Sequence, residues 1–343
     1  MAGKPGFETR CIVTWGVLGT SLVVLGYTLA WLFSAREPVT YLLALVLSNT
    51  SRNSPLSIAL FWVISLVPAL WLSPSPTSTG VTANPGDNGD VKRRTEFRVV
   101  GLRVRQITAR KWYHLLAVIL FSPGIILQPR FQALALIIAL VLFCCVECVR
   151  LARLWPLADL LQAYLSRYLD SREKGPLIVS HTYLLLGITL PLLLSLLLLE
   201  SSKPMSSSTP TWASSLVSDH LLGSPDSGAH AVLGLSGVIS LGIGDTFASV
   251  VGINIGRRFL PGIPGTKKSL EGTLGAFGSM CAFSYAAVYL TRQLVPVTIT
   301  IIVTLTSFLT AVLEAVTDQM DNLYLPAYFF TWSLLGMVVM GAS

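Results

Sequence analysis

The chain has 343 residues, of which 52% are hydrophobic and only 12% are charged. Such a composition excludes an ordinary water-soluble domain and predicts an all-α protein, a polytopic transmembrane helical bundle with cytosolic loops. The net charge of +7 comes from basic residues in a few loops, and no tract interleaves basic and aromatic residues. Membrane orientation therefore explains the charge, and we expect no nucleic acid partner.

The N-terminal third is expected to hold membrane spans followed by a polar, basic loop. Residues 11–33 are long enough to cross a bilayer, and residues 56–72 form a marginal second span. Residues 73–90 are rich in Pro, Ser, Thr, Gly and Asn, which predicts a disordered loop. Residues 92–111 carry six arginines and are expected to form an interfacial helix on the cytosolic side.

Apolar runs predict further spans in the remainder of the chain. They cover residues 115–127, 131–149, 180–200, 229–241, 271–292, 295–313 and 324–340. If the crossings alternate, one face carries the loops around Lys92, Arg150, Lys267 and Asp318. These loops hold most of the 24 basic residues, so this face is predicted to be cytosolic. The predicted units are N-terminal spans (1–72), a basic loop (73–109) and a C-terminal transmembrane domain (110–343).

The main polar interruption of the C-terminal domain runs from Gly242 to Thr273. Its glycines leave backbone N–H groups open to an anion, and Lys267 and Lys268 add two positive charges. This combination indicates phosphate binding. The segment is not a Walker loop, because Thr266 stands where that motif requires glycine before its lysine. The alternative is that the glycines are small-residue helix contacts in a membrane bundle, namely Gly242, Gly244, Gly252 and Gly256.

Acidic side chains in two places can hold a hard cation such as Mg²⁺. Asp245 and Glu271 flank the glycine-rich segment, together with the hydroxyl groups of Thr246 and Ser249. A second group consists of Glu314, Asp318 and Asp321, whose i, i+4, i+7 spacing predicts one helical face at a membrane boundary. Clustered carboxylates are unfavourable near lipid, so the spacing indicates a metal or a cationic partner; the alternative is a solvated helix end.

Taken together, four segments resemble the CTP-dependent polyprenol kinases. They are Arg110–His114, Lys174–His181 with the following Tyr183, Gly244–Ser249 through Gly265–Gly272, and Glu314–Pro326. The resemblance covers roughly the C-terminal two thirds of the chain, and the four segments are specific in combination. The sequence departs from the family at Ile263 and Pro264, which lengthen the loop before the two lysines. The N-terminal part is shorter than in eukaryotic members.

This resemblance implies an activity. The expected reaction transfers the γ-phosphate of CTP to the terminal hydroxyl of dolichol or another polyprenol. The enzyme is expected to be multi-pass in the endoplasmic reticulum membrane, with its active site facing the cytosol, and to supply the lipid carrier for protein glycosylation. Phosphoryl transfer requires mainly positioning and charge neutralisation, which glycines, lysines and acids provide.

The resemblance also assigns roles to residues. Lys267 and Lys268 are expected to neutralise the β- and γ-phosphates. The wider CTP-binding set is Gly244, Ser249, Gly252, Gly256, Gly265, Thr266, Lys267, Lys268, Ser269, Glu271, Gly272 and Thr273. The expected catalytic or magnesium-binding acids are Asp245, Glu314, Asp318 and Asp321. Further candidates are Lys111, His114, His181 and Asn322.

Three other functions remain open at this point. A diacylglycerol kinase would use the same site with another lipid, and a phosphatidate cytidylyltransferase would attach CMP to a lipid phosphate. A lipid transporter or scramblase with a broken helix at mid-membrane would consume no CTP. The oligomeric state and the base among the acids are left open.

Overall fold

The computed structural model describes most of the helical part of the chain. The described residues are 19–20, 23–24, 27, 55–71, 75–76, 96–99, 102–154, 157–165, 179–201, 228–259, 268–317 and 321–340. The N-terminal span predicted over residues 11–33 lies outside this set, apart from helical positions 19–20, 23–24 and 27.

Most helices overlap the predicted apolar runs, but two, over residues 157–165 and 245–254, lie outside them. The helices are α3 (Pro55–Trp71), α4 (Gln106–Leu127), α5 (Pro129–Leu151), α6 (Leu157–Leu165), α7 (Val179–Ser201), α9 (Gly228–Gly234), the π-helical η1 (Val238–Gly244), α10 (Asp245–Asn254), α11 (Leu270–Arg292), α12 (Val297–Val316) and α13 (Asp321–Met340). Three short strands, β1 (Ser75–Pro76), β2 (Glu96–Val99) and β3 (Leu102–Arg105), precede α4. The prediction of an all-α, multi-pass bundle is therefore confirmed, with one small sheet added.

Within the described residues, five helices are long and apolar enough to cross a membrane. They are α5, residues 182–199 of α7, α11, α12 and most of α13. A sixth span results if α9 and the continuous segment from η1 to α10 are counted as one element, bent by 64° at the break between them. The protein is a multi-pass membrane protein.

The prediction of an interfacial helix over residues 92–111 is wrong. Strands β2 and β3 pair antiparallel there, with Phe97 opposite Val104 and Arg98 opposite Arg103, and α4 begins only at Gln106. The physical reason is visible in the sequence, because charged and apolar residues alternate along both strands. A period of two is typical of a strand and cannot give a helix one apolar face. Within the segment predicted to be disordered, β1 pairs with β2.

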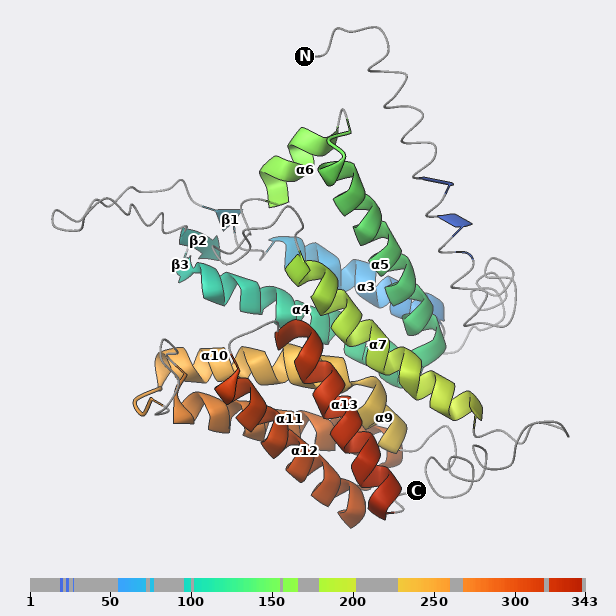
Figure 1. Cartoon of the computed structure of the whole chain (residues 1–343), viewed down its shortest axis with the longest axis vertical. Coiled ribbons are helices and arrows are strands. Elements are labelled where there is room, and N and C mark those ends of the chain that lie inside the picture. Colours follow the sequence, from blue (N-terminus) through green and yellow to red (C-terminus); the bar gives the residue numbers. More distant parts are fainter. Residues whose placement is uncertain are drawn as a thin grey trace, which may run out of the picture.

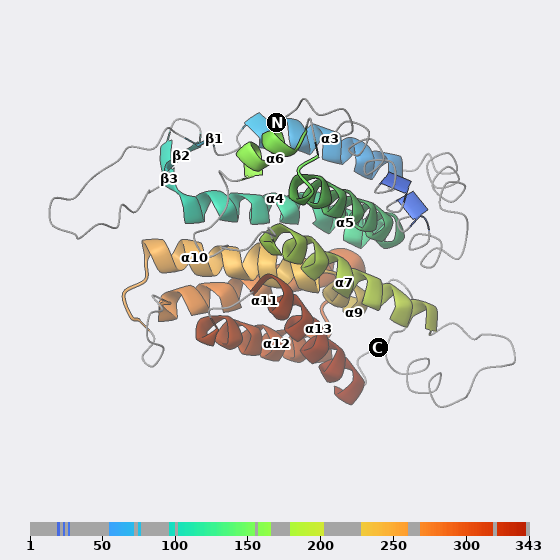
Figure 2. The same cartoon turned by 45° about the horizontal axis from the view of Figure 1, so that its top comes forward.

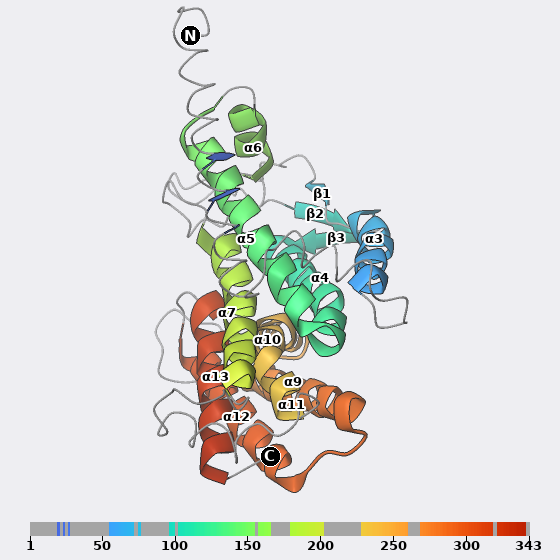
Figure 3. The same ribbon diagram turned by 90° about the vertical axis from the view of Figure 1, so that its right-hand side faces the viewer.

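The helices pack around η1 and α9, which form the centre of the bundle. All residues of both elements are buried. In the series α10, α11, α12, α13, α7 and α5, each helix contacts the next. Helix α4 contacts both α5 and η1 (Figures 1 and 2). Figure 3 shows α3 beyond α4, away from α13. A helix buried on all sides must be apolar or small all round, as η1 is.

Two glycines allow η1 and α7 to cross with their backbones in contact. A Cβ atom on Gly237 would lie 2.3 Å from the carbonyl oxygen of Gly187. A Cβ on Gly187 would in turn lie 2.2 Å from the carbonyl oxygen of Asn322 at the start of α13. Close approach of this kind needs residues without a side chain. The crossing therefore fixes α7, η1 and α13 at one point.

Candidate active site

An ion pair joins α4 to the first residue of α10. The Lys111 ammonium group donates to Asp245 Oδ2, and His114 Nδ1 lies 3.2 Å from the same oxygen atom. Lys111 and His114 lie one turn apart and so face the same neighbour. Asp245 is only 9% exposed and His114 7%. The first and third of the four resembling segments thus meet at a buried carboxylate.

Glycines on η1 permit this contact. A Cβ on Gly242 would lie 2.3 Å from Val118 of α4, and one on Gly244 would lie 2.9 Å from the sulfur of Met280 in α11. Both positions are helical, as are all residues from Val238 to Asn254. The expectation of an open glycine loop is therefore wrong for this part of the segment, because helical amides bond to preceding carbonyl groups. The alternative of small-residue helix contacts describes these positions.

A second set of close contacts, between glycines and Ser269, lies at the far end of α10. A Cβ on Gly252 would lie 3.2 Å from Ser269 Oγ, and one on Gly256 only 2.6 Å. Ser269 is buried and caps α11, because its Oγ accepts a hydrogen bond from the Gly272 amide at 3.2 Å. The site thus has two levels, an inner one at Asp245 and an outer one at Gly252 and Ser269. Gly252 follows Asp245 by seven residues, so the levels are about 11 Å apart along the helix axis at 1.5 Å per residue.

Lys268 binds the end of α12. Its ammonium group donates to the carbonyl oxygens of Glu314 and Thr317, the latter at 2.6 Å. The last carbonyl groups of a helix have no partner within the helix, and a cation there also compensates the helix dipole. The third and fourth resembling segments therefore meet at this point. The sequence pattern did not predict this contact.

Glu271 closes the connection between α10 and α11. Its Oε2 accepts hydrogen bonds from the backbone amides of Arg257 at 3.1 Å and Arg258 at 3.2 Å. The amide of Leu270 returns a bond to the Arg258 carbonyl at 2.8 Å, and Phe259 pairs with Ser269. Two amides of the segment thus already bind a carboxylate of the chain itself. Glu271 is placed to shape this loop.

Glu314 and Asp321 do not lie on one continuous helix, contrary to the predicted face of three acids. Helix α12 ends at Val316, and its C-cap residue Thr317 has extended backbone angles, φ −103° and ψ 142°. Helix α13 begins anew at Asp321. Glu314 is buried on α12 and Asp321 begins α13, so these two acids belong to different helices. The i, i+4, i+7 rule fails because it assumes an uninterrupted helix.

Some of the remaining predicted residues have described side chains, and the others do not. Thr273 and Ser249 lie on α11 and α10, and the Thr273 hydroxyl donates to the Ser269 carbonyl at 3.2 Å. Asn322 lies against Gly187 of α7, so the fourth segment contacts the helix that also carries His181 of the second. Outside the description are Gly265, Thr266, Lys267, Asp318 and the side chains of His181 and Asp321.

Magnesium is implied by the expected chemistry, and the donor set can be tested against it. Among the described side chains, no three His, Cys, Asp or Glu groups form a metal-binding cluster. Asp245 fits a metal poorly, because two basic groups contact its Oδ2. Of the acids predicted at the end of α12, Glu314 has a described side chain, a buried carboxylate of the kind that the hard ion prefers. Thr246, predicted as a hydroxyl ligand beside Asp245, has a buried hydroxyl with no hydrogen-bond partner among the described residues.

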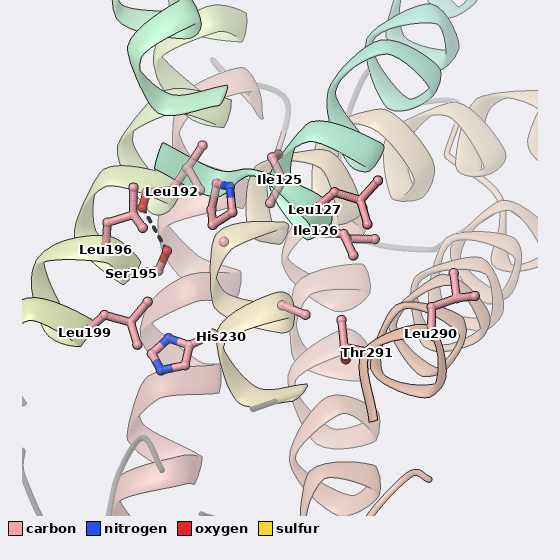
Figure 4. A pocket seen from close by; sticks show the side chains of 13 residues that line it. Ile125, Ile126, Leu127, Leu192, Ser195, Leu196, Leu199, His230, Leu290 and Thr291 are labelled. Atoms are coloured by element: carbon pink, nitrogen blue, oxygen red, sulfur yellow. Dashed lines mark hydrogen bonds between the residues drawn. The ribbon is translucent and has the colours of Figure 1, made fainter. Parts of the chain in front are cut away.

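A separate cavity of about 320 Å³ lies near the opposite end of the bundle (Figure 4). Its wall is formed mainly by leucine and isoleucine side chains, with His230, Ser195 and Thr291 as polar members. The Ser195 hydroxyl donates to the Leu192 carbonyl, and that of Thr291 donates to its own helix. This cavity shares no residue with the four resembling segments.

The fold and the contacts of Lys111, Asp245 and Lys268 define the class of protein. It is a multi-pass membrane protein whose helices bring basic, acidic and glycine-rich segments together. Residues 89–240 match the family model described as dolichol kinase. The chain is 35% identical over 233 residues to the dolichol kinase EVAN of Arabidopsis thaliana, covering 67% of this chain and 35% of that protein. The resemblance to the dolichol kinases is thereby confirmed.

Two further relatives agree. The chain is 36% identical over 222 residues to the human dolichol kinase, covering 64% of this chain and 36% of the relative. It is 30% identical over 327 residues to the dolichol kinase sec59 of Schizosaccharomyces pombe, covering 94% of this chain and 55% of the relative. The chain spans about a third of the plant and human proteins and about half of the yeast protein. No solved structure matches it at a significant level.

Proposed function

We propose that the chain is a CTP-dependent dolichol kinase. It transfers the γ-phosphate of CTP to dolichol at the cytosolic face of the endoplasmic reticulum membrane, and the product, dolichyl phosphate, serves protein glycosylation. The carrying observation is that the first, third and fourth resembling segments contact one another, and that the fourth also contacts α7, the helix that begins within the second. Lys111 contacts Asp245, Lys268 contacts the end of α12, and Gly187 of α7 contacts Asn322.

We assign different roles to the residues at the outer and the inner level of the site. Lys267 and Lys268 neutralise the triphosphate at the outer level, where Lys268 already stands at the end of α12. Glu314, Asp318 and Asp321 would hold Mg²⁺ there, and the ion would neutralise phosphate charge. Asp245 holds Lys111 and His114 in place at the inner level, as a positioning residue.

In the reaction, the dolichol hydroxyl oxygen forms a bond to the γ-phosphorus. The bond between that phosphorus and the bridging oxygen breaks, and CDP leaves. The proton of the hydroxyl passes to a carboxylate at the α12–α13 junction. Positive charge from the two lysines compensates the negative charge on the transferring phosphoryl group and on CDP.

Label transfer tests the proposal. The purified protein is incubated with Mg²⁺, either γ- or α-labelled CTP, and either dolichol or diacylglycerol. The proposal predicts label on dolichol from γ-labelled CTP alone. Label on diacylglycerol would contradict the substrate, label from α-labelled CTP would indicate a cytidylyltransferase, and intact protein that consumes no CTP would favour a transporter.

A further inference from the structure

We propose that a groove between α12 and α13 binds the isoprenoid chain of the polyprenol, with the hydroxyl end at Thr317. This inference rests on the proposed kinase function and names the place of its lipid. The groove has a volume of about 640 Å³. Its walls are formed by Leu313, Thr317, Tyr324, Leu325, Ala327, Tyr328, Thr331, Trp332 and Leu335.

The threonines in the groove wall have satisfied hydroxyl groups. Thr317 Oγ1 donates to the Leu313 carbonyl at 2.8 Å, and Thr331 Oγ1 donates to the Ala327 carbonyl at 2.8 Å. Each hydroxyl therefore bonds within its own helical turn. What the threonines then offer an occupant is chiefly methyl groups, beside leucine and aromatic side chains. Such a wall suits a hydrocarbon chain rather than a polar ligand.

Aromatic rings line one side of the groove in a regular stripe. Tyr324, Tyr328 and Trp332 follow at intervals of four residues and so lie on one face of α13. The rings of Tyr328 and Trp332 meet edge to face, with centroids 6.1 Å apart. Tyr324 is 62% exposed and Trp332 37%, so both rings have apolar surface that an occupant can cover. Flat, weakly polar faces pack well against the methyl branches and double bonds of an isoprenoid.

The groove runs lengthwise along one helix. Its wall on α13 includes the twelve residues from Tyr324 to Leu335, which are eleven steps of 1.5 Å or about 16 Å. One linear chain can follow a single groove of this kind, whereas the two acyl chains of diacylglycerol need two paths. The remainder of a long polyprenol would continue into the bilayer.

One end of the groove adjoins the proposed phosphate site. Thr317 belongs to the groove wall, and its carbonyl accepts a hydrogen bond from Lys268. A hydroxyl group at that end lies next to the residues that would bind CTP. The cavity of Figure 4 lacks this relation, because it is bounded by Leu290, twenty residues and about 30 Å along α11 from Leu270. The groove is therefore the better lipid site.

Photocrosslinking and kinetics together test the groove. A polyprenol with a diazirine on its second isoprene unit is irradiated with the full chain in nanodiscs, and labelled residues are identified by mass spectrometry. We expect labels on residues 313–335, suppressed by excess polyprenol but not by diacylglycerol. In parallel, Ala327→Trp fills the groove, while Ala282→Trp places the same side chain at an exposed position of α11.

Ala327→Trp should raise the KM for dolichol about tenfold, equivalent to ~1.4 kcal/mol, with kcat retained at saturating lipid. Ala282→Trp should change neither value. Labels confined to the Figure 4 cavity or to lipid-facing helices elsewhere would overturn the groove, as would equal kinetics for the two variants. If wild-type protein phosphorylates no lipid while the crosslinks fall in the groove, the kinase function fails and the lipid site stands.

Discussion

The ammonium group of Lys111 contacts the carboxylate of Asp245 across 134 positions of sequence. Asp245 opens α10, directly after the buried η1, and Lys111 lies in the second turn of α4. The pair therefore ties α4 to the central element of the bundle. His114 approaches the same oxygen atom, so one carboxylate organises two basic groups.

Removing one member of this pair should be costly. Lys111→Met leaves a largely buried carboxylate without its main counter-charge, which should lower the free energy of unfolding by on the order of 3 kcal/mol. Thermal unfolding in detergent measures the loss. The double variant Lys111→Met with Asp245→Asn should recover part of this stability, because no unpaired charge remains. Equal melting temperatures of the single variant and the wild type would contradict a stabilising pair.

Glycine substitutions in α11 test the contact between α10 and α11. A Cβ on Gly272 would lie 2.8 Å from the Ala248 carbonyl oxygen and 3.2 Å from the Gly252 Cα. Gly272→Ala should therefore force the helices apart and destabilise the protein by about 1–3 kcal/mol. Gly278→Ala in the same helix meets nothing within 4 Å and serves as the matched control. It should be neutral or stabilising, since alanine has the higher helix propensity.

Glu271 should hold Arg257 and Arg258 in place after α10. Glu271→Ala removes the acceptor of their two amides, so cleavage after Arg257 and Arg258 in limited proteolysis should become faster. Glu271→Gln keeps an oxygen acceptor at the same place and should show an intermediate cleavage rate. A cleavage rate of the alanine variant equal to that of the wild type would show that the carboxylate does not hold the loop.

Much of the architecture could be predicted from the sequence, because apolar runs of sufficient length specify membrane helices. The runs at 131–149 and 295–313 correspond to α5 and α12 within a few residues. The pairing of β2 with β3 does not follow from the arginine-rich composition, which indicates a membrane interface; it depends on the alternation of charged and apolar side chains. The division of the chain at residues 72 and 109 stays a prediction.

The candidate site was predictable in residue types but not in contacts. Lys268 was expected to bind phosphate, yet in the structure it bonds the carbonyl groups at the end of α12. Glu271 was expected near a metal, and it bonds two backbone amides instead. Both contacts depend on how α10, α11 and α12 pack. Sequence spacing carries no information on such pairings between separate helices.

The most direct test of the central claim compares γ-phosphate transfer from CTP to dolichol in two variants. Lys267→Ala removes a charge that should neutralise the triphosphate, and Gly278→Ala changes a position with open space around it. Membrane insertion and melting temperature are measured for both. The account predicts that Lys267→Ala inserts normally and transfers no label, while Gly278→Ala retains wild-type activity. Full transfer by the Lys267→Ala variant would contradict it.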